Sequence, residues 1–217
     1  MASVAVKNRK NAYLNQNALF RKKISVKDVM NSKKLVEPLK LLDCSYVCNG
    51  ASAIFLSGEE ESKKYTDVPV WIEGIGSSVE AASFSNVSSD LSSIHSTRIA
   101  SNMAFSMTNI KPEQIDVVEL HDAFTIMEIM AYEDMGFCKK GEGGKFVFQK
   151  NISINPRGGL LGTGHPLGAT GIAQTVEISE QLKELAGIRQ IKGCKSGLVH
   201  NMSAAGSSSL VLIISKT

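Results

Sequence analysis

Residues 155–171 read NPRGGLLGTGHPLGATG, the most distinctive stretch of this 217-residue chain. Its glycines allow the backbone to approach a ligand closely and leave amide N–H groups free to donate hydrogen bonds. Pro166 suits the first position of a helix, and an apolar helical pattern follows it. The sequence therefore predicts a helix over residues 166–186, with His165 at its N-cap.

The charge state of His165 would follow from that position. A helix N-terminus carries partial positive charge, which disfavours a protonated imidazole. We therefore expect a neutral ring near pH 7, as a general base requires. Two alternatives stay open: a glycine-rich turn that contains a histidine by chance, and a phosphate loop, which is weaker because the Walker lysine is missing.

Two further histidines follow predicted strands. His121 comes after residues 115–120 and opens the next helix, and His200 follows a short apolar stretch. Because such strand-to-loop positions face the binding crevice in open α/β sheets, we expect both to share one site with His165. His95 lies in a serine-rich loop and is expected to be structural or exposed. A zinc site is a weak alternative, since no two histidines are close in sequence and no HExxH is present.

Strand and helix patterns alternate after the first third of the chain, which is typical of an α/β layer. Residues 1–40 show only a weak helical pattern and no core of their own. The expected strands are residues 51–56, 68–75, 115–120, 196–201 and 208–215, with mixed strand signals over 146–154, and the expected helices are residues 98–108, 122–135 and 166–186.

The composition excludes several classes of protein. The chain is 43% apolar and 21% charged, ordinary values for a globular protein. The longest aliphatic run, residues 210–214, is too short to span a bilayer. No signal peptide is recognisable, and the four cysteines lack metal or secreted spacing, so we expect a reducing, cytoplasmic compartment and no membrane partner.

Positive charge is concentrated at the N-terminus. Residues 1–40 contain ten Lys and Arg against two acidic residues, a balance of +8 in a chain with a net charge of +3. Such an arm suggests a phosphate-bearing partner, and a solvated surface is the simpler alternative. Only Tyr13 and Phe20 are interleaved aromatics, so we expect no nucleic-acid partner.

Four blocks of the sequence resemble one family. Residues 155–171 closely resemble the signature near the C-terminus of thiolases. Residues 119–124 (ELHDAF) and 198–202 (LVHNM) resemble the matching blocks of sterol-carrier-type and archaeal thiolases, and residues 42–51 resemble the segment before the last strand of the thiolase N-terminal half. The blocks occur in the family's order along nearly the whole chain.

The resemblance implies a particular α/β fold. Residues 70–217 would form the thiolase C-terminal domain, a layered α-β-α structure with a mixed five-stranded sheet. Residues 1–69 would be an incomplete piece of the N-terminal half and its loop region, ending with that half's last strand.

The resemblance also implies roles for individual residues. His165 would activate a nucleophilic cysteine, and His121 would hold the thioester oxygen in an oxyanion hole, directly or through water. Coenzyme A would be a substrate and no cofactor would be needed; the reaction would be Claisen condensation of two acyl-CoA molecules or its thiolytic reversal. The candidate site residues are the catalytic His121, His165 and His200 and the substrate-binding Ser45, Phe124, Gly164, Gly168, Ser203 and Ala204.

The nucleophilic cysteine itself is missing, because thiolases carry it in the half that this chain does not match. We expect the chain's own cysteines to be structural. The second, proton-donating cysteine is also absent, since Ala123 and either His200 or Asn201 stand where relatives place it. The cysteines concerned are Cys44, Cys48, Cys138 and Cys194.

Two interpretations follow. The chain is either one part of a split thiolase, completed by a cysteine-bearing chain, or a non-catalytic thiolase-like protein that binds acyl-CoA or a partner. A related steroid-chain aldolase group, with tyrosine at the position of His121, is a weaker third. The retained histidines and glycines favour the split enzyme. We expect an oligomer, and a small OB-fold partner such as archaeal relatives use is an open alternative.

Overall fold

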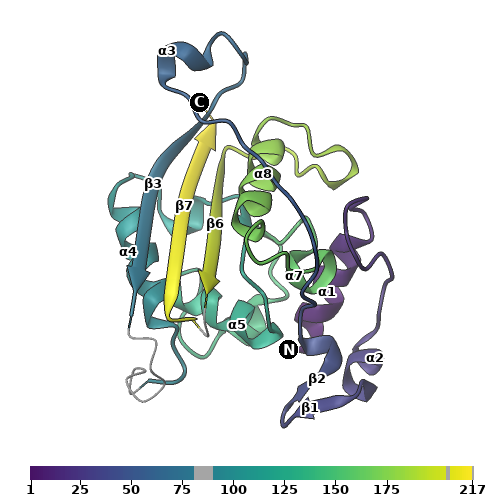
Figure 1. Cartoon of the computed structure of the whole chain (residues 1–217). Coiled ribbons are helices and arrows are strands. Elements are labelled where there is room, and N and C mark those ends of the chain that lie inside the picture. The colour runs from purple at the N-terminus through teal and green to yellow at the C-terminus, as the bar shows by residue number, and fades with distance from the viewer. Residues whose placement is uncertain (81–89, 204–205, 217) are drawn as a thin grey trace.

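The computed structural model describes residues 1–80, 90–203 and 206–216 and contains the expected mixed five-stranded sheet (Figure 1). The strand order is β3-β7-β6-β4-β5. Strands β3, β7 and β6 pair antiparallel, whereas β4 runs parallel to both β6 and β5. The strands are β3 (Val70–Val79), β4 (Val117–Glu119), β5 (Ser153–Ile154), β6 (Ser196–Ser203) and β7 (Ser208–Lys216).

Helices cover both faces of this sheet. On one face α4 packs against β3 and β7 and contacts α5, which in turn contacts α6; on the other face α8 packs against β6 and β4. Most helices lie within a few residues of the predicted positions, but residues 146–154 form the end of a helix, a polar break and a two-residue strand. The helices are α4 (His95–Ser106), α5 (Thr125–Asp134), α6 (Gly143–Phe146) and α8 (Thr170–Leu182).

The strand pleat divides the core in two. Successive side chains of a strand point to opposite faces. Val118 and Leu198 therefore join the core beneath α4 and α5, whereas their neighbours Val117 and Val199 join the core beneath α8. The same alternation places His200 and Asn201, two neighbouring polar residues of β6, on opposite faces of the sheet.

Glycines allow α4 to lie unusually close to β3. A Cβ on Gly74 or Gly76 would collide with the carbonyl oxygens of Ala104 and Ala100 in α4. The strand predicted from the sequence ended at residue 75, but β3 continues through both glycines to Val79. Their place in the strand follows from the helix packed above them.

The first residues form a well-packed helix, although their sequence shows only a weak helical pattern and predicted no core of their own. Helix α1 packs against α7 and α5 beside the glycine-rich motif. Its buried face carries Asn8 and Arg9 between apolar residues, and these polar side chains obscure the helical period in the sequence. The first elements are α1 (Ala2–Ala12), α2 (Val26–Asn31), the hairpin β1 (Lys34–Val36) and β2 (Leu39–Lys40), and a 3-10 turn at Leu41–Asp43; α7 spans Gly159–Thr163.

The strand predicted over residues 51–56 is extended but unpaired within the part of the chain that the structure describes. It runs past α8 towards the short helix α3 (Glu59–Ser62) (Figure 1). Phe55 and Leu56 are largely exposed. A strand requires a neighbouring strand for its hydrogen bonds, and this segment lacks one here. A cavity of about 450 Å³ lies between its C-terminal end, α8 and β3.

No helix among the described residues has the length and apolar character needed to cross a membrane.

Candidate active site

The loop that carries His165 is tied to the strand end that carries His121. Asp122 accepts hydrogen bonds from the backbone N–H groups of Leu160 (2.6 Å) and Leu161 (3.3 Å), which open helix α7. Such N–H groups have no partner within a helix. Gly159 has a φ of +58°, and a Cβ there would collide with the Asp122 carboxylate. The two motifs therefore form one structural unit.

A buried polar network extends this unit to α1. The Asn8 amide donates to Asp122 and to Glu128, at 2.7 Å each, and Lys7 forms an ion pair with Glu128 at 2.8 Å. Burial and the neighbouring Glu128 raise the pKa of Asp122 to about 7. Through Asp122, the first helix thus helps to hold the glycine-rich loop that carries His165, which the sequence did not reveal.

The backbone of His165 is held by the segment that follows Cys44. The His165 N–H donates to the Tyr46 carbonyl (2.7 Å), and the Cys48 N–H donates to the His165 carbonyl (3.3 Å). Gly164 precedes it with a φ of +86°, and a Cβ there would lie 2.6 Å from Cys48 Sγ. A side chain at position 164 would displace this segment.

The prediction that His165 caps the long helix is wrong. Helix α8 begins at Thr170, with Ala169 as its N-cap, and residues 166–169 form a turn. The helix dipole therefore does not account for the charge state of the ring. Burial lowers the pKa of His165 instead, so the expected neutral imidazole is retained for a different reason.

A hydroxyl group determines which nitrogen of His165 is basic. His165 Nδ1 lies 2.8 Å from Thr170 Oγ1, and that hydroxyl donates its single proton to the Pro166 carbonyl at 3.0 Å. The hydroxyl must then accept from Nδ1–H. The lone pair of the neutral ring is on Nε2, which makes no hydrogen bond to any described residue. A general base at this position would act through Nε2.

His121 lies directly against His165, as the sequence predicted. The ring centroids are 4.9 Å apart and the rings are nearly perpendicular, at 87°. Burial lowers the pKa of His121 to about 3, with smaller contributions from the positive charges that His200 and His165 would carry. Two neutral imidazoles therefore share the site at neutral pH.

His200 does not join this pair through its side chain. It lies inside β6 rather than at a strand end, is fully buried, and its Nε2 is 2.9 Å from Thr97 Oγ1 of α4. Burial lowers its pKa to about 4. The next residue, Asn201, points to the α8 face and contacts His121 Nδ1 at 3.2 Å. The period-2 pattern of a strand was the signal that could have distinguished the two neighbours.

Two of the expected substrate-binding residues, Ser45 and Phe124, are brought together. Ser45 donates its N–H to the Ala123 carbonyl at 2.8 Å, and Cys44 forms an isolated β-bridge with Phe124. Phe124 is 37% exposed, enough for its ring to contact a ligand. Of the other expected substrate-binding residues, Gly164 is buried, Gly168 and Ser203 are exposed, and Ala204 lies outside the described residues.

None of the four cysteines is disulfide-bonded. Burial raises the pKa of Cys44, and it raises the pKa of Cys138 and of Cys194 to about 11. These three thiols are therefore poor nucleophiles at neutral pH. Cys48 lies beside Gly164 on the segment that holds His165.

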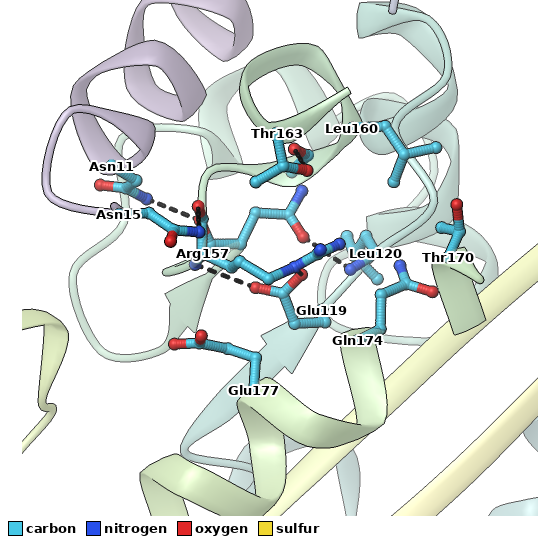
Figure 2. Close-up of polar contacts among 12 residues, drawn as sticks. Asn11, Asn15, Glu119, Leu120, Arg157, Leu160, Thr163, Thr170, Gln174 and Glu177 are labelled. Carbon is cyan, nitrogen blue, oxygen red and sulfur yellow. Dashed lines mark hydrogen bonds and ion pairs between the residues drawn. The ribbon is translucent and has the colours of Figure 1, made fainter. Parts of the chain in front are cut away.

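The arginine of the glycine-rich motif has a structural partner. Arg157 donates from its backbone N–H and its Nε to the buried carboxylate of Glu119, at 3.1 and 3.4 Å. Figure 2 shows this pair between α1 and α8, with Glu177, Gln174 and Thr170 along the same helix. The motif's positive charge is thus used in holding the loop to β4.

Together these observations define an α/β protein with a pair of neutral histidines at the end of a mixed sheet. Residues 76–216 match the sequence model of the thiolase C-terminal domain-like family. The match spans more than half of the chain, and the chain belongs to this family.

Two curated relatives resemble nearly the entire chain. This chain is 40% identical over 222 residues to the acetyl-CoA acetyltransferase of Methanothermobacter thermautotrophicus. The aligned region covers 100% of this chain and 58% of that protein. The chain is 35% identical over 232 residues to sterol carrier protein 2 of Oryctolagus cuniculus, covering 97% and 40% respectively. The chain thus spans about half the length of the curated relatives it matches.

The fold also matches a solved structure, the Ltp2-ChsH2(DUF35) aldolase. The TM-score is 0.84 at 24% identity, over 99% of this chain and 57% of that chain. At this identity the comparison supports the fold alone.

Proposed function

We propose that this chain is the C-terminal part of a split thiolase that transfers acyl groups between coenzyme A thioesters. The observation that carries the proposal is the pair His165 and His121, held edge to face with both Nδ1 atoms occupied. The acetyl-CoA acetyltransferase name of archaeal relatives supports the same reaction class.

In the proposed reaction a partner chain supplies the nucleophilic cysteine. His165 Nε2 takes the thiol proton, and the thiolate attacks the thioester carbon of an acyl-CoA. His121 holds the oxygen that becomes negative in this step. The coenzyme A thiolate leaves, takes up a proton and an acyl-cysteine remains. In the condensation, a second acyl-CoA loses an α-proton to a base in the assembled site, its α-carbon attacks the acyl-cysteine, and the cysteine thiolate leaves. Thiolysis runs in the reverse direction: the thiolate attacks the 3-keto carbon of a 3-ketoacyl-CoA, the C–C bond breaks, and the acyl-CoA carbanion leaves and takes up a proton. Free coenzyme A then takes the acyl group from the cysteine.

The unpaired segment over residues 51–56 supports an incomplete assembly. Among the described residues it pairs with no strand, the side chains of Phe55 and Leu56 are largely exposed, and cavities border its two ends along α8. An extended segment with free hydrogen-bonding groups pairs readily with another chain. We propose that the cysteine-bearing chain covers this segment in a cytoplasmic hetero-oligomer.

A further small partner is a second element of the proposal. The structurally similar aldolase has a name that joins two components, Ltp2 and ChsH2(DUF35). We extend this to the present chain as a candidate small subunit alongside the cysteine-bearing one, in line with the OB-fold partner that the resemblance to archaeal thiolases suggests.

Reconstitution tests the proposal. The chain is co-expressed with a thiolase N-terminal-half chain, and thiolysis of acetoacetyl-CoA is measured for the pair, for each chain alone and for a pair whose nucleophilic cysteine is replaced by alanine. We expect activity in the intact pair only, with hydrogen-exchange protection of residues 51–56 on assembly. Coenzyme A binding by an assembled but inactive pair would favour the non-catalytic alternative. A chain that remains alone and exposes residues 51–56 in every mixture would contradict the split enzyme.

A further inference from the structure

The orientation of one buried amide is determined by a backbone carbonyl. Gln174, on α8, is completely buried, and its Nε2 donates to the His200 carbonyl at 3.2 Å. A carbonyl oxygen only accepts hydrogen bonds, so the amide nitrogen must lie on that side. The Gln174 Oε1 atom is therefore directed to the other side, where it accepts from Asn201 Nδ2 at 3.0 Å.

This arrangement determines the orientation of the second amide. Asn201 Nδ2 carries two hydrogens, and one of them is directed to Gln174. The same nitrogen lies 3.2 Å from His121 Nδ1. Rotating the Asn201 amide by half a turn would place its oxygen against the Gln174 oxygen. Both atoms only accept hydrogen bonds, so no hydrogen would lie between them. The amide nitrogen of Asn201 is thus the donor that meets His121.

The Asn201 donor determines which nitrogen of the His121 ring carries the proton. Because Asn201 offers a hydrogen to Nδ1 of His121, this atom must carry the lone pair, and the ring proton must be on Nε2. Nε2 makes no hydrogen bond to any described residue. His165 has the opposite arrangement, since Thr170 requires its proton on Nδ1.

We propose that Gln174 and Asn201 are positioning residues that hold His121 in the Nε2–H tautomer, so that the histidine pair offers one hydrogen-bond donor and one acceptor. The proposal deepens the acyltransferase function and rests on it for its catalytic meaning. A thiol proton can be taken only by a nitrogen with a lone pair, and a thioester oxyanion can be held only by a nitrogen with a hydrogen. Identical tautomers in both rings would lose one of these two roles.

Ring-nitrogen NMR of the full chain tests the tautomers without requiring catalysis. The chain is labelled with ¹⁵N in its histidines, and signals are assigned with single variants such as His121→Gln. Protonated and unprotonated ring nitrogens differ clearly in chemical shift, so each tautomer is read directly. At neutral pH we expect the proton on Nε2 in His121 and on Nδ1 in His165. A proton on Nδ1 of His121 in the parent chain would overturn the proposal.

Two variants and one control test this relay, the chain of hydrogen bonds from Gln174 through Asn201 to His121. Asn201→Asp replaces the amide by a carboxylate that only accepts, so we expect the His121 proton to move to Nδ1. Gln174→Met removes both hydrogen bonds with an apolar side chain of similar length, and we expect His121 to show a mixture of tautomers. Asn102→Asp, exposed on α4, makes the same chemical change away from the site and should leave the His121 tautomer unchanged. If Asn201→Asp does not fold, Gln174→Met decides the question: a single unchanged tautomer would overturn the relay.

Activity of the assembled protein then separates the relay from the proposed function. Loss of one oxyanion donor lowers kcat by about 100-fold or more, and we expect Asn201→Asp to do so with little change in KM. Full activity in this variant with an inverted tautomer would overturn the catalytic role of the relay. Absence of turnover in the parent assembly would instead contradict the proposed function, and the NMR result would still decide the tautomers.

Discussion

Gly162 in α7 packs directly against Ala12 in α1. A methyl group on Gly162 would overlap the Ala12 side chain and lie 3.2 Å from the carbonyl oxygen of Asn8. Both residues are buried, and the contact joins the first helix of the chain to the loop that presents His165.

This contact predicts a specific pair of stability changes. Gly162→Ala should lower the free energy of unfolding by about 1–3 kcal/mol, the usual effect of overpacking a core. Adding Ala12→Gly recovers the space, so the double variant should be more stable than the two single changes predict by at least about 1 kcal/mol. Gly144→Ala, where an added methyl meets nothing within 4 Å, is the control. Additive losses in denaturant unfolding would show that α1 does not pack on α7 in solution.

Removing the proposed base tests the assignment of His165. In the assembly with a cysteine-bearing chain, His165→Ala should reduce turnover by about 100-fold or more, the scale of a lost general base. His200→Ala should reduce it less, because that imidazole lies on the α4 face of the sheet. His95→Ala, at the start of α4 and paired with Glu80, serves as the control. Unchanged turnover in the His165 variant would refute its role.

Buried His200 predicts a dependence of stability on pH. Its folded-state pKa is about 4, whereas the pKa of an unfolded histidine is about 6.5. Between these values only the unfolded chain binds the proton, so this group lowers stability as pH falls from about 6.5 to about 4, by up to ~3 kcal/mol. Above about pH 6.5 it makes no difference.

The comparison with His200→Gln isolates this effect from other titrating groups. We expect the stability difference between parent and variant, measured by urea unfolding, to shrink steadily between pH 6.5 and pH 4. A difference that stays constant over this range would mean that His200 is not buried as a neutral ring.

The N-terminal arm predicts a preference for coenzyme A over dephospho-coenzyme A. Part of its charge is already used within the fold: Lys7 pairs with Glu128, and Arg9 stacks on Phe20 at 4.0 Å. The remaining positive charges of residues 1–40 are available to contact the 3′-phosphate of coenzyme A, which dephospho-coenzyme A lacks. Contacts between exposed charges weaken as the salt concentration rises.

Calorimetry on the assembled protein at two salt concentrations checks this preference. Coenzyme A should bind more tightly at low salt, and the difference should narrow as salt rises. The variant Lys22→Gln should reduce the preference more than Lys195→Gln, an exposed change outside the arm. Equal affinity for the two ligands at low salt would place the arm elsewhere, and tight binding of duplex DNA would favour a nucleic-acid partner.

Much of the fold could be predicted because its signals are local. Runs of β-branched residues and 3.6-residue periods identified most of the sheet and three of its covering helices. The helix α1 could not be found in this way, since Asn8 and Arg9 occupy its buried face and are paired only in the folded state. The segment over residues 51–56 has the composition of a strand but not the partner that would make it one.

The family motif, the strand end that carries His121 and the loop that carries His165 can be identified from the sequence alone. The protonation of these two rings, and the contact of Asn201 rather than His200 with His121, follow from the tertiary structure. The reason is that Asn201 meets residues 27 and 80 positions away in the chain, Gln174 and His121. Local patterns specify the direction and burial of a side chain, but the proton on a histidine follows from hydrogen-bond partners that only folding brings together.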